Sequence, residues 1–131
     1  MRHNMRDKNR IGTIVDSLEN AWRLNPDISF FNLIWDIYHD DEQWTLYYKE
    51  DDYWEAYIEK KFCIDYKKIL DTEPLSKQQK DLIILFKTIW EEYYDLRFPQ
   101  VCNLIYRFIA DKTSDEQVLK ILKEKVGEIL G

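Results

Sequence analysis

Of the chain's 131 residues, 45% are hydrophobic, 34% are charged and 15% are aromatic, and the formal net charge is −6. This length and balance predict one globular domain and exclude a disordered tail. The three glycines are isolated, which excludes the glycine-rich loops that hold phosphate groups, and the negative charge makes direct nucleic-acid binding a poor expectation. Because the sequence has no long hydrophobic stretch and no secretion signal, we expect a cytoplasmic protein with no membrane partner.

The spacing of hydrophobic residues predicts helices from the end of a basic, flexible N-terminal arm (residues 1–8) onward. The first apolar face extends over Ile11–Trp22, and Asn25-Pro26-Asp27 ends this helix. Ser29 is placed to cap a second helix with an apolar face over Phe30–Tyr38.

The middle of the chain is predicted to be less regular. A short extended strap is expected near residues 43–48, where β-prone residues gather. The acidic run Glu50-Asp51-Asp52 suits the start of a third helix, which continues or restarts over Ile64–Leu70. Asp71-Thr72-Glu73-Pro74 is the clearest break in the sequence.

Three further helices carry recognisable start signals. Ser76 with Gln79, and Ser114 with Gln117, have the spacing of capping boxes, and Pro99 suits the first turn of the helix between them. The prediction is therefore an all-α protein, a compact bundle of about six helices that form one domain over residues 9–131.

A weak internal repeat is visible. Trp22-x4-Asp27-Ile28-Ser29-Phe30 is matched 68 residues later by Trp90-x4-Asp95-Leu96-Arg97-Phe98, and Asn32-Leu33-Ile34-Trp35 is matched 71 residues later by Asn103-Leu104-Ile105-Tyr106. The change of offset requires an insertion between the two matches. Two quasi-repeated helical halves, residues 9–70 and 76–131, would share one core.

Residues 6–60 contain a set of short motifs that are found together in other proteins: Asn9-Arg10-Ile11, Leu18-Glu19, Trp22, Asn25-Pro26-Asp27, Phe30, Leu33-Ile34 and Leu46-Tyr47-Tyr48-x-Glu50-Asp51-Asp52. In these motifs the sequence resembles the YihD-like group of small bacterial and phage proteins. In the second half Asp95-Leu96-Arg97-Phe98 is similar to the group, whereas Pro99 stands where its members have a small residue. The resemblance implies a small helical protein and assigns no catalytic residue.

The main functional prediction concerns the aromatic and acidic segment between Trp44 and Tyr57. Its predicted partner-binding residues are Trp44, Tyr47, Tyr48, Asp51, Asp52, Trp54 and Glu55. Tryptophan and tyrosine are enriched at protein–protein hot spots, and acidic neighbours steer a basic partner toward them. The function predicted is a non-enzymatic protein–protein interaction module, with a basic protein or a second copy of the chain as its partner. The alternative for these rings is that they anchor the segment to an aromatic core.

Two other functions stay open. One is a phage or mobile-element inhibitor or immunity-type protein that masks a basic partner surface with its carboxylates. The other is a small metal-dependent hydrolase centred on Asp36, His39 and Asp40, which share one helix face. No catalytic residue and no cofactor is predicted. No metal site is predicted either, because a metal site needs three or four converging ligands. Cys63 and Cys102 are expected to be reduced, buried thiols.

Overall fold

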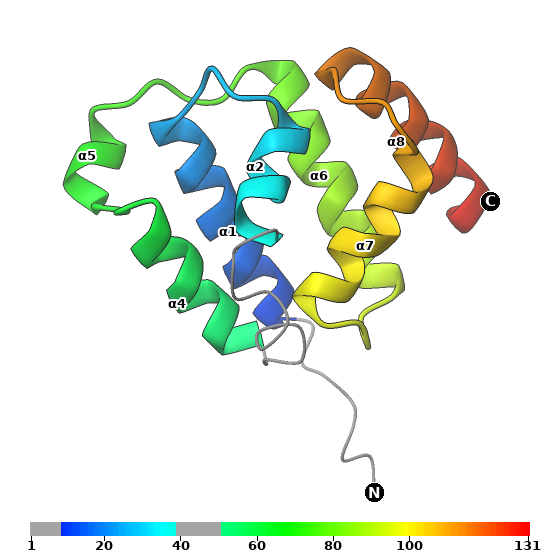
Figure 1. Cartoon of the computed structure of the whole chain (residues 1–131), viewed down its shortest axis with the longest axis horizontal. Coiled ribbons are helices and arrows are strands. Elements are labelled where there is room, and N and C mark those ends of the chain that lie inside the picture. Colours follow the sequence, from blue (N-terminus) through cyan, green and yellow to red (C-terminus); the bar gives the residue numbers. More distant parts are fainter. Residues whose placement is uncertain (1–8, 39–50) are drawn as a thin grey trace, which may run out of the picture.

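The computed structural model describes residues 9–38 and 51–131, and within these ranges every regular element is a helix. The helices are α1 (Asn9–Leu24), α2 (Phe30–Tyr38), α4 (Asp51–Lys61), α5 (Tyr66–Leu70), α6 (Lys77–Glu92), α7 (Phe98–Ile109) and α8 (Asp115–Leu130). The predicted all-helical bundle is confirmed (Figure 1). The basic arm 1–8 and the strap near residues 43–48 lie outside the described residues.

The described ranges hold seven helices rather than about six, because the third predicted helix stops and restarts. Cys63 has a φ of 50°, its N–H bonds to the Lys60 carbonyl, and the Ile64 N–H bonds to the Glu59 carbonyl. These bonds form a Schellman motif, which ends α4. Asp65 then caps α5 by accepting a hydrogen bond from the Lys67 N–H at 2.9 Å. Cys63 is exposed at this junction, so the prediction of a buried thiol is wrong for Cys63.

The two predicted capping boxes differ in how many of their hydrogen bonds form. At α6 both bonds of the capping box form, since the Ser76 hydroxyl accepts from the Gln79 N–H and the Gln79 side chain accepts from the Ser76 N–H. At α8 only half of the box forms. Ser114 accepts from the Gln117 N–H, but the Gln117 side chain bonds to the Ser114 hydroxyl instead of the backbone. Pro99 lies in the first turn of α7, as predicted.

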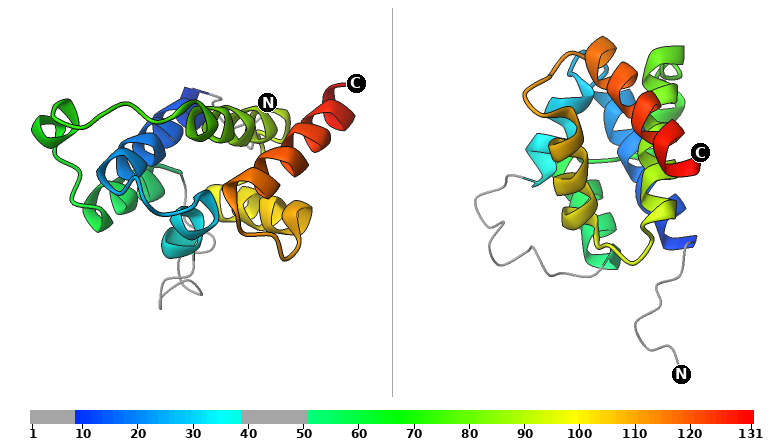
Figure 2. Two further views of the ribbon diagram at one scale, coloured as in Figure 1. Left: turned by 90° about the horizontal axis from the view of Figure 1, so that it is seen from above. Right: turned by 90° about the vertical axis from the view of Figure 1, so that its right-hand side faces the viewer.

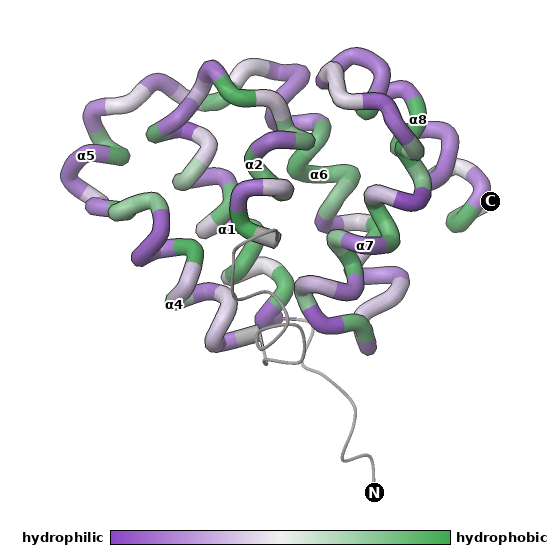
Figure 3. The backbone as a smooth tube through the Cα atoms, in the orientation of Figure 1, coloured by the Kyte–Doolittle hydropathy of each residue, from purple (hydrophilic) through white to green (hydrophobic). Residues whose placement is uncertain are grey.

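The central pair of helices consists of α1 and α6, which contact each other. α4 packs along α1 and α8 packs along α6. The helices therefore form two similar groups, with α1, α2 and α4 in the first and α6, α7 and α8 in the second. α2 and α7 lie together on one side of the central pair (Figure 2). Hydrophobic and hydrophilic positions alternate along the helices, as an amphipathic helix requires (Figure 3).

One hydrophobic core extends through both groups of helices. Its largest fully buried side chains include Trp22, Trp54, Trp90, Phe30, Phe86 and Phe98. Phe30 of α2 meets Phe86 of α6 at 5.9 Å between ring centroids, and Trp54 of α4 meets Phe98 of α7 at 5.4 Å. These ring pairs join one group of helices to the other. Each group by itself would therefore expose these aromatic side chains to water.

The two helix–corner–helix pairs share the same local geometry. The Trp22 indole N–H donates to the Ile28 carbonyl at 2.9 Å, and the Trp90 indole N–H donates to the Leu96 carbonyl at 2.8 Å. In each case a tryptophan near the end of one helix bonds to the carbonyl six residues later, in the corner that leads to the next helix. Phe30 and Phe98, the first residues of α2 and α7, are both buried against these tryptophans.

The offset of 68 residues continues into the second helix of each pair. Phe30, Leu33, Ile34 and Ile37 are buried in α2, and Phe98, Val101, Cys102 and Ile105 are buried in α7. These positions correspond at a constant offset, so no insertion is needed and the 71-residue match is out of register with the packing. The outer boundaries of the two halves, 9–70 and 76–131, stay a prediction.

Candidate functional site

The structure describes only part of the predicted partner-binding segment. Trp44, Tyr47 and Tyr48 lie outside the described residues. Asp51 is the first residue of α4, and its side chain is also outside the description.

Trp54 lies in the core and not on a binding surface. Its side chain is 1% exposed, and its ring packs against Tyr57 at 5.3 Å as well as against Phe98. Trp54 and Ile58 are four residues apart, which puts both on the face of α4 that packs on α1. For Trp54 the alternative interpretation, an anchor to the aromatic core, is therefore correct.

Asp52 and Glu55 lie at the start of α4, beside α1. The Asp52 carboxylate accepts a hydrogen bond from the Tyr53 N–H at 2.9 Å and pairs with Arg10 at 3.3 Å, while 75% of its side chain stays exposed. Arg10, Asp52 and Glu55 line a cleft of about 200 Å³. Because Arg10 offsets part of the acidic charge, this surface is less negative than the sequence suggests. An ion pair that is this exposed to solvent adds little stability.

Of the three residues that the hydrolase alternative names, the structure describes only one. Asp36 is exposed on α2, and His39 and Asp40 lie outside the described residues. Within residues 9–38 and 51–131, no group of three metal-ligating side chains converges, and no helix is long and apolar enough to cross a membrane. Cys102 is buried, and burial raises the pKa of its thiol well above the usual value, so it is protonated and poorly nucleophilic at neutral pH.

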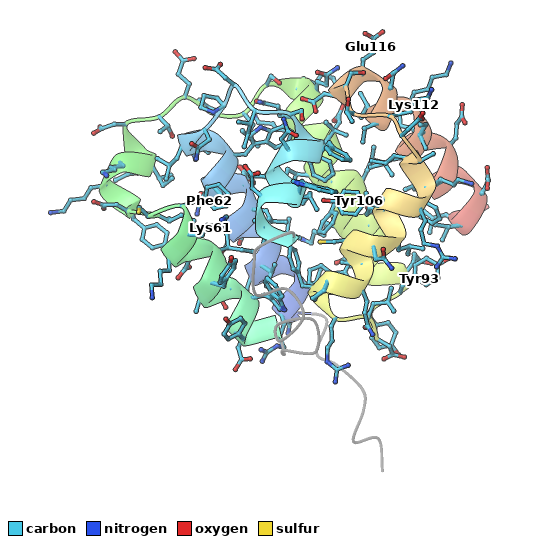
Figure 4. All side chains as sticks on the ribbon, in the orientation of Figure 1. Lys61, Phe62, Tyr93, Tyr106, Lys112 and Glu116 are labelled. Atoms are coloured by element: carbon cyan, nitrogen blue, oxygen red, sulfur yellow. The ribbon has the colours of Figure 1, made fainter. Side chains whose placement is uncertain are left out.

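A different set of aromatic side chains reaches the surface, on α2 and α7. The Trp35 ring stacks on Phe31, with centroids 5.6 Å apart and an interplanar angle of 16°, and it meets Tyr106 edge-on at 5.9 Å. Tyr106 also contacts Phe31 at 5.4 Å and lies where α7 faces α2 (Figure 4). Trp35 is 43% exposed, whereas Phe31 and Tyr106 are half-buried. We call Phe31, Trp35 and Tyr106 the ring cluster.

The second helix–corner–helix pair shows that this local geometry does not require a tryptophan at the position of Trp35. At the 68-residue offset, Phe31 corresponds to Pro99 and Trp35 corresponds to the exposed Asn103. The same geometry therefore forms around Trp90 without a tryptophan at the position of Trp35. An indole that is 43% exposed and that this local geometry does not require is a candidate for contact with a partner.

The sequence contains a signal for the ring cluster. Phe31 and Trp35 are four residues apart, and both fall outside the stripe formed by Phe30, Leu33 and Ile37. Such a second apolar stripe on a short helix indicates a face that packs on something besides the core. The contribution of Tyr106 could not be inferred, because it depends on how α7 packs beside α2.

Comparisons with protein-family models, with curated proteins and with solved structures find no match to this chain. The resemblance to the YihD-like group therefore stays a prediction.

Proposed function

We propose that this protein is a non-enzymatic protein–protein interaction module and that it contacts its partner through the ring cluster. The observation that carries the proposal is Trp35, a tryptophan 43% exposed and held in place by Phe31 and Tyr106. Aromatic side chains that are already ordered lose little conformational entropy when a partner covers them. The acidic–aromatic segment 44–57, apart from the buried Trp54, remains a proposed extension of this surface.

The net charge of −6 supports a basic partner. Exposed carboxylates such as Asp36 and Asp52 would attract a positively charged protein and speed its association. An inhibitor or immunity-type protein that covers a basic surface is one form of this proposal. A second copy of the chain is the other partner proposed.

The proposal is tested by comparing three forms of the protein as bait in a lysate of the native host. Wild type, Trp35→Ala and Tyr66→Ala are compared, and each captured protein is then purified and its affinity for all three is measured by calorimetry. Tyr66 is 64% exposed on α5, which makes it a matched control for an exposed aromatic side chain elsewhere. We expect Trp35→Ala to lose at least tenfold in affinity, about the effect of one hot-spot residue, and Tyr66→Ala to bind like wild type. A partner that binds Trp35→Ala as tightly as wild type contradicts the proposal.

A further inference from the structure

A cavity of about 660 Å³ lies where the end of α1 meets the linker between α5 and α6, residues 71–76. Figure 1 shows this linker passing beside the corner between α1 and α2 before it enters α6. All of the lining residues belong to the part of the chain that the structure describes. The volume lies within the range of about 300–1,000 Å³ that is usual for sites that bind small molecules.

Long-range hydrogen bonds hold the walls of this cavity in place. The Gln79 side-chain amide donates to the Pro26 carbonyl at 3.1 Å, which ties the start of α6 to the corner after α1. Arg23, near the end of α1, donates to Thr72 of the linker from both Nε and Nη2. These bonds join residues that are 53 and 49 apart in the chain. The fold therefore forms the cavity in advance, and a ligand would meet walls that are already ordered.

Most polar groups that line the cavity spend their hydrogen bonds on one another. Ser76 and Gln79 form the capping box of α6. The Thr72 hydroxyl accepts from Arg23 and donates to a carbonyl of α5. Two charged groups keep unused capacity: Arg23 donates through Nε and Nη2 only, so its Nη1 has no acceptor among the described residues. The exposed Glu73 carboxylate forms neither an ion pair nor a hydrogen bond with any described residue.

The rest of the cavity wall is apolar. It is formed by Leu24, Pro26, Pro74 and Leu75. A ligand that matches the whole lining therefore combines a negative group for the guanidinium, a positive group for the carboxylate and an apolar part. An α-amino acid carries its carboxylate and its ammonium on the same carbon atom, beside its side chain.

We propose that this cavity binds a free α-amino acid with an apolar side chain. The ligand carboxylate pairs with the guanidinium of Arg23, the ammonium pairs with the carboxylate of Glu73, and the side chain lies against the apolar wall. A guanidinium is well suited to a carboxylate, whose oxygens accept its N–H groups. Glu73 would repel a simple anion and Arg23 a simple cation, which is why a zwitterion fits better than either. The inference is independent of the proposed function, because the cavity and the ring cluster share no residue.

The test titrates the full chain with L-phenylalanine while backbone amide and methyl signals are followed by NMR. The ring of this probe shifts nearby signals, and we expect the largest changes at Leu24, Thr72 and Leu75. Three further probes each lack one feature: N-acetyl-L-phenylalanine has no ammonium, L-phenylalaninamide has no carboxylate and glycine has no side chain. We expect the first two to bind at least about threefold more weakly than phenylalanine, and glycine about 10- to 100-fold more weakly because it buries no apolar surface.

Glu73→Gln isolates the contact with the ammonium and removes no hydrogen bond of the fold. We expect this variant to bind phenylalanine about 3- to 10-fold more weakly, but to bind N-acetyl-L-phenylalanine no more weakly than wild type does. Glu92→Gln is the matched control, because Glu92 is also exposed and ends α6 at the far end from Ser76. It should bind every probe like wild type. Arg23 is left unchanged, since its bonds also hold the linker.

Three results would each overturn the inference. The first is that the signals of the lining residues do not change at about 20 mM phenylalanine, since these contacts together imply a dissociation constant of about 10 mM or less. The second is that L-phenylalaninamide or N-acetyl-L-phenylalanine binds as tightly as phenylalanine. The third is that Glu73→Gln binds phenylalanine like wild type. None of these results bears on capture of a partner protein by the ring cluster.

Discussion

The backbone N–H of Phe30 donates a hydrogen bond to the carboxylate of Asp115, with a nitrogen–oxygen distance of 2.7 Å. Phe30 begins α2 and Asp115 begins α8, so this bond joins two helices that are 85 residues apart in the chain. The carboxylate satisfies one of the N–H groups that every helix leaves unpaired at its start. It thereby fixes the end of the helix that carries the ring cluster.

This bond leads to a prediction about pH. Burial raises the pKa of Asp115 above 3.8, and the Phe30 hydrogen bond opposes the rise. A raised pKa means that the folded state disfavours the charged form. The stability contributed by Asp115 is therefore full below pH 3.8 and is lost as the pH rises through the folded-state value. We expect Asp115→Asn, which keeps an acceptor for Phe30, to gain stability relative to wild type over this range.

Urea unfolding of wild type and Asp115→Asn at pH 3.5, 5 and 7 (roughly spanning the titration of a perturbed aspartate) checks this expectation. A wild type that gains on the variant as the pH rises would show that the hydrogen bond outweighs burial. Asp115→Ala removes the acceptor altogether, and we expect it to cost about 1–3 kcal/mol in the free energy of unfolding, because the Phe30 N–H loses its partner.

The buried side chains of Trp22, Trp54 and Trp90 are predicted to differ in their response to the same substitution. Trp22→Phe and Trp90→Phe each leave a corner carbonyl without its indole donor. Trp54 is buried to the same degree, but among the described residues its indole N–H has no acceptor. We expect Trp22→Phe and Trp90→Phe to lower the free energy of unfolding by about 2–4 kcal/mol, and Trp54→Phe by about 1–2 kcal/mol less.

Chemical unfolding of the three variants measures these costs directly. Equal losses at all three positions would mean that ring volume, and not the hydrogen bond, decides the cost. A much smaller loss at Trp90 than at Trp22 would contradict the equivalence of the two corners.

Two opposite exchanges of glycine and alanine are both predicted to stabilise the protein. Ala110 has φ 54° and ψ −116°, and the Lys112 N–H bonds to the Ile109 carbonyl at 3.0 Å. This is a type II′ turn with Ala110 at the position that favours glycine, so Ala110→Gly relieves backbone strain and should raise the free energy of unfolding by about 0.5–2 kcal/mol.

Gly127 lies inside α8, where an added Cβ meets no atom within 4 Å, so Gly127→Ala should raise the free energy of unfolding by about 0.5–1 kcal/mol. Thermal unfolding of both variants measures the gains, and a lower midpoint for Ala110→Gly would show that the turn is unstrained.

Arg23 is predicted to hold α5 in place. Its guanidinium donates to the Thr72 hydroxyl at 3.1 Å, to the Ile69 carbonyl at 3.1 Å and to the Thr72 carbonyl at 3.3 Å. A five-residue helix is too short to be stable alone, so α5 depends on these bonds and on burial of Ile69. We expect Arg23→Ala to speed hydrogen exchange at the Asp71 and Thr72 amides by about 10- to 100-fold, since loss of the bonds costs about 1.5–3 kcal/mol.

Arg23→Lys is the matched variant for this prediction. A lysine keeps the charge but cannot reach three acceptors from one planar group, so we expect most of the protection to be lost. Exchange in α7 should not change in either variant. Faster exchange throughout the chain would instead indicate that Arg23 stabilises the whole fold.

The helix ends were the most predictable part of this structure. Ser76, Gln79 and Pro99 act within a few residues of their own position, so their roles can be inferred from spacing alone. The Trp22 and Trp90 corners were visible for the same reason. Whether the third helix continues or restarts near Cys63 stayed open, because an ordinary residue with positive φ leaves no trace in the sequence.

The candidate site was much harder to predict. Trp54 lies among acidic residues, and the sequence could not show that α4 turns this side chain toward α1 and α7. Trp35 lies outside the main apolar stripe of α2, which the sequence does show. The ring cluster also depends on Tyr106, which comes from a helix far along the chain.

The sequence by itself determined that this chain is helical, where most of its helices begin and end, and which apolar stripes must be buried. These properties follow from propensity, capping and periodicity, which act over a few residues. Only the tertiary structure decided which of the aromatic side chains that it describes are buried and which reach the solvent. The physical reason is that burial depends on the neighbouring helices: Trp54 meets Phe98 only once α4 and α7 are packed together, and Trp35 meets Tyr106 only once α7 lies beside α2.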